Sequence, residues 1–278
     1  MKYCLRILLL ACLCGNARAA RVDTVLVPSA AMHKSVKCVV ITPDGRAAGT
    51  PQALRVIYLL NGHSGNHSDY VRHMAAYLEQ QADLHHWLFV CPDGNNSWYW
   101  DSPVDSNFRY ETFISKELPA YIDAHHATLA NRSGRAITGL SMGGHGALFN
   151  AIRHPDVFGA VGSMSGGVDI RPFPDNWDIA KRIGKLDSAA HNWDAYTVME
   201  QLSRLQPGAL AITFDCGVKD FFHTVNRNLH EKLLAMGIDH DYTERPGEHN
   251  WDYWDNSIQF QLLFFQHYFA SAMGAAKK

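Results

Sequence analysis

The sequence predicts an α/β fold in which helices flank a central, mostly parallel β-sheet. Strand-like apolar runs alternate with helical stretches along the chain. The central runs at residues 56–60 and 88–90 are apolar without polar alternation, as strands covered on both faces are. Of the 278 residues, 47% are hydrophobic, and 25 Lys and Arg stand against 27 Asp and Glu. This balance excludes a disordered chain and a polybasic nucleic-acid binder.

The strands and helices follow one another in a regular order. Strands are expected at residues 35–41, 55–60, 87–91, 136–140, 160–164 and 210–216. Helices are expected at residues 69–81, 112–125, 142–153 and 222–236, and a last short strand at 241–243 precedes a terminal helix. Residues 166–207 break this rhythm and predict an insertion over one end of the sheet. With no repeat or flexible linker, residues 20–278 are expected to form a single domain.

The first nineteen residues have the pattern of an export signal. Lys2 and Arg6 border a short apolar run, and small residues at Ala17 and Ala19 precede the expected cleavage point. A lipoprotein cleavage site at Cys12 is the weaker alternative, because the apolar run before it is very short. No other stretch has the ~18 apolar residues that a membrane helix needs. The mature protein is therefore expected to be periplasmic or secreted.

The mature chain keeps three cysteines, which is an odd number. Cys38, Cys91 and Cys216 lie in apolar strand-like runs at irregular spacing, without a C-x-x-C pair. Buried free thiols are therefore expected rather than a disulfide framework or a zinc site, although one disulfide stays open. The chain also lacks an H-E-x-x-H motif and a carboxylate-rich loop, so no metal is expected.

The strongest chemical signal is the G-x-S-x-G motif at residues 139–143. It falls where a predicted strand ends and a helix begins, which is the position of a nucleophile elbow with Ser141 at its tip. The turn is strained, and a Cβ at Gly139 or Gly143 would crowd the neighbouring strand or helix. In this setting a Gly/Ser turn without chemistry is the less favoured interpretation.

A serine hydroxyl needs a histidine to take its proton, and an acid to orient that histidine. His249 fits because it lies in a polar loop after the last strand, whereas the other late histidines fall in or beside helices. Asp220 is the expected acid, since a Gly-containing loop after the strand can turn it toward His249. Asp215 lies in the strand itself, and the alternative role for Asp220 is a helix N-cap.

Acyl transfer also requires two N–H donors for the negative oxygen that develops on the substrate. The residue after the nucleophile, Met142, supplies one backbone N–H. The second is expected from His63, because Gly62 and Gly65 allow a sharp turn just beyond the strand at residues 55–60. The His63 side chain is expected to be a cavity wall rather than a base.

Five motifs in this order resemble the esterase D or tributyrin esterase group of α/β hydrolases. They are Y-L-L-N-G at 58–62, P-D-G-N-N-S-W-Y at 92–99, G-L-S-M-G-G at 139–144, D-C-G at 215–217 with D-F at 220–221, and P-G-E-H-N-W at 246–251. That group includes S-formylglutathione hydrolases, feruloyl and acetyl xylan esterases, and mycolyltransferases. The resemblance implies the α/β-hydrolase fold and the same nucleophile, acid, base and donors. This sequence differs from the pattern of the group at Asn61, where many members have His.

The expected function is a cofactor-free serine carboxylesterase that acts on a small-molecule or carbohydrate ester. Aromatic residues at Trp98, Tyr99 and Trp177 are candidates for contact with a sugar or an aryl acyl group. Three alternatives stay open: an acyltransferase on the same scaffold, a thioesterase similar to S-formylglutathione hydrolase, and a non-catalytic binding module. The predicted export signal counts against the thioesterase. These patterns give no oligomeric state.

Overall fold

The computed structural model describes residues 20–44 and 53–275. The predicted export signal at residues 1–19, with the alternative lipoprotein site at Cys12, lies outside the described residues. Within the described part of the chain, no helix is long and apolar enough to cross a membrane.

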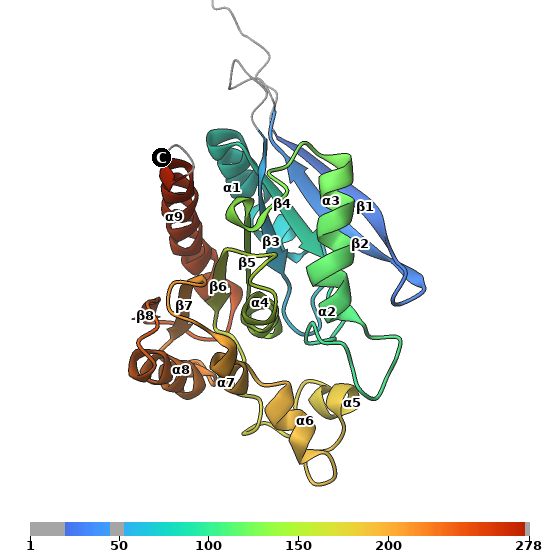
Figure 1. Ribbon diagram of the computed structural model, residues 1–278, viewed down its shortest axis with the longest axis vertical. Helices are drawn as coiled ribbons and strands as arrows, with labels where there is room; N and C mark the ends of the chain where they lie inside the picture. Colours follow the sequence, from blue (N-terminus) through green and yellow to red (C-terminus); the bar gives the residue numbers. More distant parts are fainter. Residues whose placement is uncertain (1–19, 45–52, 276–278) are drawn as a thin grey trace, which may run out of the picture.

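Eight strands form one sheet in the order β1-β2-β4-β3-β5-β6-β7-β8 (Figure 1). β2 pairs antiparallel with β1 and β4, and the remaining neighbours are parallel. The strands are β1 (Arg21–Ser29), β2 (Lys34–Thr42), β3 (Arg55–Leu60), β4 (Trp87–Pro92), β5 (Arg135–Gly139), β6 (Ala160–Met164), β7 (Ala211–Gly217) and β8 (Asp241–Arg245). The predicted α/β-hydrolase fold with a mostly parallel sheet is confirmed.

Helices cover both faces of the sheet and create two separate cores. α1 (Asp69–His85) and α9 (Trp251–Ala275) pack on one face, while α3 (Leu118–His125), α4 (Met142–Arg153) and α8 (His223–Ala235) pack on the other (Figure 1). The short elements are α2 (Tyr110–Thr112), η1 (Phe113–Glu117), η2 (Arg132–Gly134), α5 (Ile179–Ile183), α6 (Ala190–Ala195), α7 (Val198–Gln201) and η3 (Leu202–Arg204). The strands β3, β4, β5 and β6 are buried along their whole length, and for β3 and β4 the continuous apolar runs at 56–60 and 88–90 predict this.

The predicted elements agree with the structure except in two places. β1 was not predicted, because it is an edge strand with a mostly exposed side and carries little apolar signal. The helix predicted over residues 112–125 is present as one continuous helical run through α2, η1 and α3, but its middle part, η1, is a π-helix. The insertion between β6 and β7 is present and contains α5, α6 and α7, which lie at the lower end of the molecule in Figure 1.

Each of the three cysteines in the described residues is free and buried. Cys38 lies on β2, Cys91 on β4 and Cys216 on β7. Burial raises the pKa of all three thiols well above the ordinary value.

A buried histidine connects α4 to the loop after β6. The indole N–H of Trp100 donates to His145 Nε2 at 2.9 Å, so the other ring nitrogen carries the proton. Nδ1–H of His145 then donates to the Gly167 carbonyl oxygen at 2.9 Å. Burial lowers the pKa of His145 from 6.5 to about 4, which keeps the ring neutral in the folded protein.

We expect His145 to make the protein sensitive to acid. Because its folded pKa lies below its unfolded value, the unfolded state binds the proton first, and stability is lost as the pH falls from about 6.5 to about 4. The lowered pKa corresponds to a loss of roughly 3 kcal/mol across this range. Urea unfolding at pH 7.5 and 4.5 should show a smaller loss in His145→Gln, which keeps a donor and an acceptor. Equal losses in the variant and the wild type would contradict the assignment.

Candidate active site

Ser141 lies at a strained turn between β5 and α4. Its backbone has φ 56° and ψ −118°, a conformation that non-glycine residues rarely adopt. The turn is fixed by hydrogen bonds on both sides: the Ser141 N–H donates to Met164 O at 2.9 Å, and the Ser141 carbonyl accepts from His145 N at 3.1 Å. The hydroxyl is thereby held at the carboxyl edge of the sheet, at the N-terminus of a helix.

Close packing of α4 on the sheet explains the glycine after the serine. A Cβ on Gly143 would overlap the carbonyl oxygen of Leu60 in β3, and one on Gly139 would lie 2.5 Å from the Gly143 backbone. Side chains at either position would push the helix away from the strands and move the serine. The G-x-S-x-G spacing is therefore a packing requirement of this turn.

The three side chains predicted as nucleophile, base and acid are joined by hydrogen bonds. His249 Nε2 lies 2.9 Å from Ser141 Oγ, and His249 Nδ1 lies 2.7 Å from Asp220 Oδ2. The Asp220 side chain is fully buried, whereas 14% of the His249 side chain is exposed. The second carboxylate oxygen, Oδ1, accepts from Phe222 N at 2.8 Å. Asp220 thus holds its own loop and His249 at once, but it is not the N-cap weighed as its alternative role, because the N-cap residue of α8 is Phe222.

Two adjacent loops bring the acid and the histidine together. β7 and β8 are parallel, with Gly217 opposite Arg245, so both loops leave the same edge of the sheet. Val218 N donates to Arg245 O at 2.9 Å, and Lys219 N donates to Gly247 O at 3.0 Å. Parallel pairing therefore continues beyond the strands and sets the spacing of the two side chains.

The oxyanion loop, residues 61–69 after β3, approaches the serine closely. A Cβ on Gly62 would lie 2.7 Å from Leu140 Cδ1 and 3.4 Å from Ser141 Cβ, so a larger residue here would have to displace the end of the Leu140 side chain. Gly62 and His63 line the same cavity as Ser141. Met142 is the first residue of α4, where backbone N–H groups have no acceptor within the helix. The structure thus brings the segments of both expected N–H donors to the nucleophile.

Asn61 and Tyr99 support this loop from inside the protein. Asn61 Oδ1 accepts from the Gly94 N–H at 2.9 Å and from the Tyr99 hydroxyl at 3.0 Å. The Tyr99 hydroxyl is also 3.1 Å from Asn61 O. The departure from His at position 61 therefore leaves a fully bonded residue, and sequence reasoning did not detect this supporting role.

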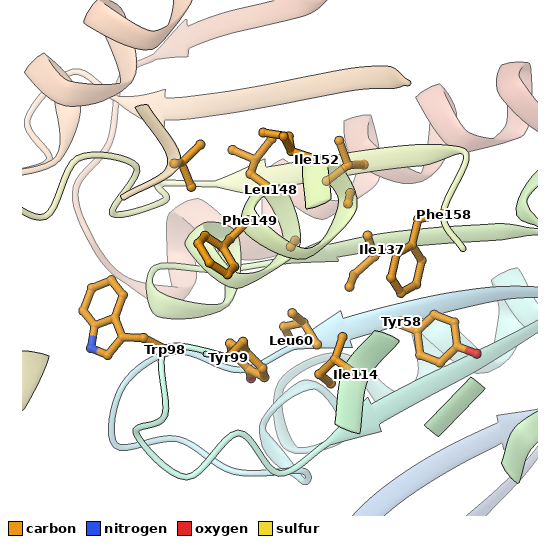
Figure 2. Packing of buried hydrophobic residues seen from close by; sticks show 14 of the residues in the cluster. Tyr58, Leu60, Trp98, Tyr99, Ile114, Ile137, Leu148, Phe149, Ile152 and Phe158 are labelled. Carbon is orange, nitrogen blue, oxygen red and sulfur yellow. The ribbon is translucent and has the colours of Figure 1, made fainter. Parts of the chain in front are cut away.

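The expectation that Trp98 and Tyr99 contact substrate does not match their placement. Both side chains are buried, with exposures of 1% and 0%, and neither lines the cavity at Ser141. Figure 2 shows both side chains among the residues of the apolar cluster that contains Phe149 of α4. The backbone turns them inward, because both residues adopt positive φ. Trp98 Nε1 instead donates to Trp177 O at 3.0 Å, so it supports the insertion.

Trp177 does line the cavity above Ser141 and His249, together with aromatic residues that sequence reasoning did not select. The cavity has a volume of about 340 Å³, and its other aromatic walls are Phe221, Trp251 and Trp254. The Phe221 ring stacks on the Trp177 ring with 5.3 Å between their centroids, and its centroid lies 4.2 Å from that of the His249 ring. The sequence signal that could have identified Phe221 and Trp251 is their position next to Asp220 and close to His249. A larger cavity of about 600 Å³ lies within the insertion and contains none of the three bonded side chains.

Asp215 has a different environment from Asp220. It is buried and accepts hydrogen bonds from Tyr253, Ser257 and Gln261 of α9 at 2.7–2.9 Å. Burial raises the pKa of Asp215, and these donors oppose the rise. The residue therefore anchors α9 to β7, as expected for a carboxylate inside the strand.

No group of three or more His, Cys, Asp or Glu side chains is placed to hold a metal ion within residues 20–44 and 53–275. Two pairs of histidines that lie close in the sequence, His63 with His67 and His125 with His126, would be alternative ligands, but members of both pairs have other contacts. His67 Nδ1 lies 3.5 Å from Asp93, and His125 Nδ1 lies 2.7 Å from Tyr121 O.

Comparison with known proteins assigns the chain to a family. The family model described as "Putative esterase" matches residues 29–265. The chain belongs to this esterase family. It is 28% identical over 217 residues to an acetyl esterase of Caldicellulosiruptor saccharolyticus, covering 74% of this chain and 80% of that protein. It is 27% identical over 205 residues to the diacylglycerol acyltransferase/mycolyltransferase Ag85B of Mycolicibacterium smegmatis, covering 60% and 62%.

Solved structures of esterases and serine hydrolases have the same fold. Fluorophosphonate-binding serine hydrolase F of Staphylococcus aureus superposes with a TM-score of 0.77 at 21% identity, covering 88% of this chain and 98% of that one. A ferulic acid esterase gives a TM-score of 0.74 at 25% identity, covering 90% and 98%. The expectation of a serine hydrolase that acts on ester bonds is confirmed by the family.

The two carboxylates should separate in their effects when each is changed to the amide. Asp220→Asn should lower kcat by roughly three to four orders of magnitude, because an amide favours the wrong imidazole tautomer at His249. Asp215→Asn should leave kcat within about tenfold and lower the free energy of unfolding by roughly 1–3 kcal/mol, since three donors lose their carboxylate. Steady-state kinetics and urea unfolding of both variants test this. A reversal of the two kcat effects would place the acid at Asp215.

Proposed function

We propose that this protein is a carboxylesterase that works through an acyl-enzyme on Ser141. The observation that supports this is the bonded series Ser141, His249 and Asp220, with distances of 2.9 and 2.7 Å, at the base of an aromatic cavity. The acetyl esterase and ferulic acid esterase relatives support the same reaction class.

In the first half-reaction, Ser141 Oγ attacks the ester carbonyl carbon while His249 Nε2 takes the hydroxyl proton. Asp220 accepts the Nδ1–H bond and stabilises the imidazolium that forms. The carbonyl oxygen becomes negative and accepts hydrogen bonds from the backbone N–H groups of His63 and Met142. The tetrahedral intermediate then collapses: the bond to the alcohol oxygen breaks, and His249 gives its proton to that oxygen.

In the second half-reaction, water replaces the alcohol. His249 takes a proton from the water, the resulting hydroxide attacks the acyl carbon, and the carboxylic acid leaves as Ser141 regains its proton. An alcohol in place of this water would give acyl transfer. The acyltransferase relative makes transfer the second candidate function, and the two differ only in which acceptor reaches the acyl-enzyme.

The cavity favours an ester with a flat or apolar group beside the carbonyl. Trp177, Phe221, Trp251 and Trp254 form its walls, and these rings provide surfaces for an aryl group or the apolar face of a sugar. We therefore propose acetyl, short-chain acyl or feruloyl esters of carbohydrate as substrates. We also propose that the chain is exported, from the signal pattern in its first nineteen residues.

Removing the nucleophile or the base should have nearly the same effect. Ser141→Ala, His249→Ala and the double variant should each lower kcat by roughly 10⁴–10⁶, because the three groups act as one unit. Hydrolysis of p-nitrophenyl acetate and methyl ferulate measures this. A fluorophosphonate should add one covalent label to the wild type and none to Ser141→Ala. Near wild-type kcat in His249→Ala would assign the base to another residue.

Activity should survive removal of metal ions. The proposed reaction uses only side chains and backbone N–H groups, so EDTA should change kcat by less than about twofold. The assay uses protein from the extracytoplasmic fraction, with added Ca²⁺ or Zn²⁺ as the control. Loss of activity in EDTA with recovery on adding metal would contradict the mechanism.

The same preparation tests the proposed export. An uncleaved protein in the cytoplasm would contradict the proposed export.

A further inference from the structure

The His63 imidazole connects the oxyanion loop to the insertion. Its Nδ1 lies 3.0 Å from Ser64 Oγ within the loop, and its Nε2 lies 3.5 Å from Asp178 Oδ2 across the cavity rim. The His63 side chain is 20% exposed and that of Asp178 is 29% exposed. The side chain of the proposed N–H donor therefore lies within ion-pair distance of a segment distant in the sequence, although its Nε2 makes no hydrogen bond there.

The insertion presents Asp178 in a fixed position. Its second oxygen, Oδ1, lies 2.8 Å from Lys181 Nζ, and this contact lowers the pKa of the carboxyl. Trp177 and Asp178 both adopt positive φ, at 49° and 58°. Aspartate tolerates this conformation, whereas a bulky residue such as tryptophan adopts it only when its surroundings impose it. Two contacts restrain Trp177: its carbonyl oxygen accepts a hydrogen bond from the buried Trp98 indole, and its ring stacks on Phe221.

We propose that Asp178 is a positioning residue: its carboxylate holds the His63 imidazole, and through it the His63 N–H, where the oxyanion forms. This inference rests on the proposed function. The contact matters for the reaction because the anchors of the loop lie on either side of His63: at Asn61 before it, and after it at Ser64, whose N–H donates to Asn96 Oδ1 at 2.6 Å, and at Asn66 and His67. His63 lies between these anchors, and the Asp178 contact adds a restraint at His63 itself.

The expected effect is on kcat rather than on KM. The negative oxygen exists in the transition state and not in the bound ester, so a misplaced donor raises the barrier without weakening substrate binding. Removal of an oxyanion donor costs roughly 10²–10³ in kcat. Because Asp178 acts through His63, its loss should cost less, about five- to twentyfold.

Asp178→Asn is the informative variant. Asparagine tolerates positive φ, so the substitution removes the charge and keeps the backbone conformation. We expect kcat to fall about five- to twentyfold with KM within twofold. Binding of a tetrahedral boronic acid inhibitor should weaken by the same factor as kcat/KM. Asp175→Asn is the matched control, since Asp175 is an exposed carboxylate in the same insertion with no ion pair to His63. It should change none of these values.

A double-mutant cycle tests that the effect passes through His63. His63→Phe keeps the backbone N–H and removes both side-chain contacts, and it should lower kcat to a similar extent. In that background Asp178→Asn should have little further effect. Should Asp178→Asn fold poorly, the same kcat loss with unchanged KM in His63→Phe still tests the restraint.

Three outcomes would overturn the proposal: unchanged kcat in Asp178→Asn, a change in KM alone, or an equal loss in the wild-type and His63→Phe backgrounds. Failure of the proposed function would look different. In that case Ser141→Ala would keep activity, or fluorophosphonate would not label Ser141, whatever the result at position 178.

Discussion

The site depends on one constraint, the approach of α4 to the sheet at the turn that carries Ser141. The backbone of Ser141 adopts a left-handed conformation, and glycine at 143 lets the helix lie against the Leu60 carbonyl. A strained residue of this kind costs roughly 1–3 kcal/mol, which burial of the surrounding helix and strands must offset. α4 is almost entirely buried, so the packing that compensates for the strain also fixes the direction of the hydroxyl.

The other parts of the site are attached to this turn by separate elements of the fold. Asp220 and His249 arrive on adjacent loops whose spacing follows from the parallel pairing of β7 and β8. The oxyanion loop is supported from below by Tyr99, which lies in the core. The insertion is joined to the same core by Trp98. The buried aromatic residues Trp98 and Tyr99 after β4 thus connect the core to the insertion and to the oxyanion loop.

Much of the fold and the bonded side chains could be predicted from the sequence because their signals are local. The central strands β3 and β4 contain continuous apolar runs, and the elbow needs glycines at fixed spacing around Ser141. The inward direction of Trp98 could not be predicted, because it depends on positive φ angles that the local sequence does not reveal. The contact between His63 and Asp178 joins residues 115 positions apart, so no spacing rule connects them. β1 was missed because an exposed edge strand has a weak apolar pattern.

The three free cysteines of the described residues can report where the folded protein opens. Each thiol sits on a different strand, has almost no contact with solvent, and is kept protonated by a raised pKa. Reaction with an alkylating reagent requires a thiolate that solvent can reach. In the native state, modification of Cys38, Cys91 or Cys216 must therefore wait for the local sheet to open. Rates of alkylation at the three positions would map the opening free energy across β2, β4 and β7 without any introduced label.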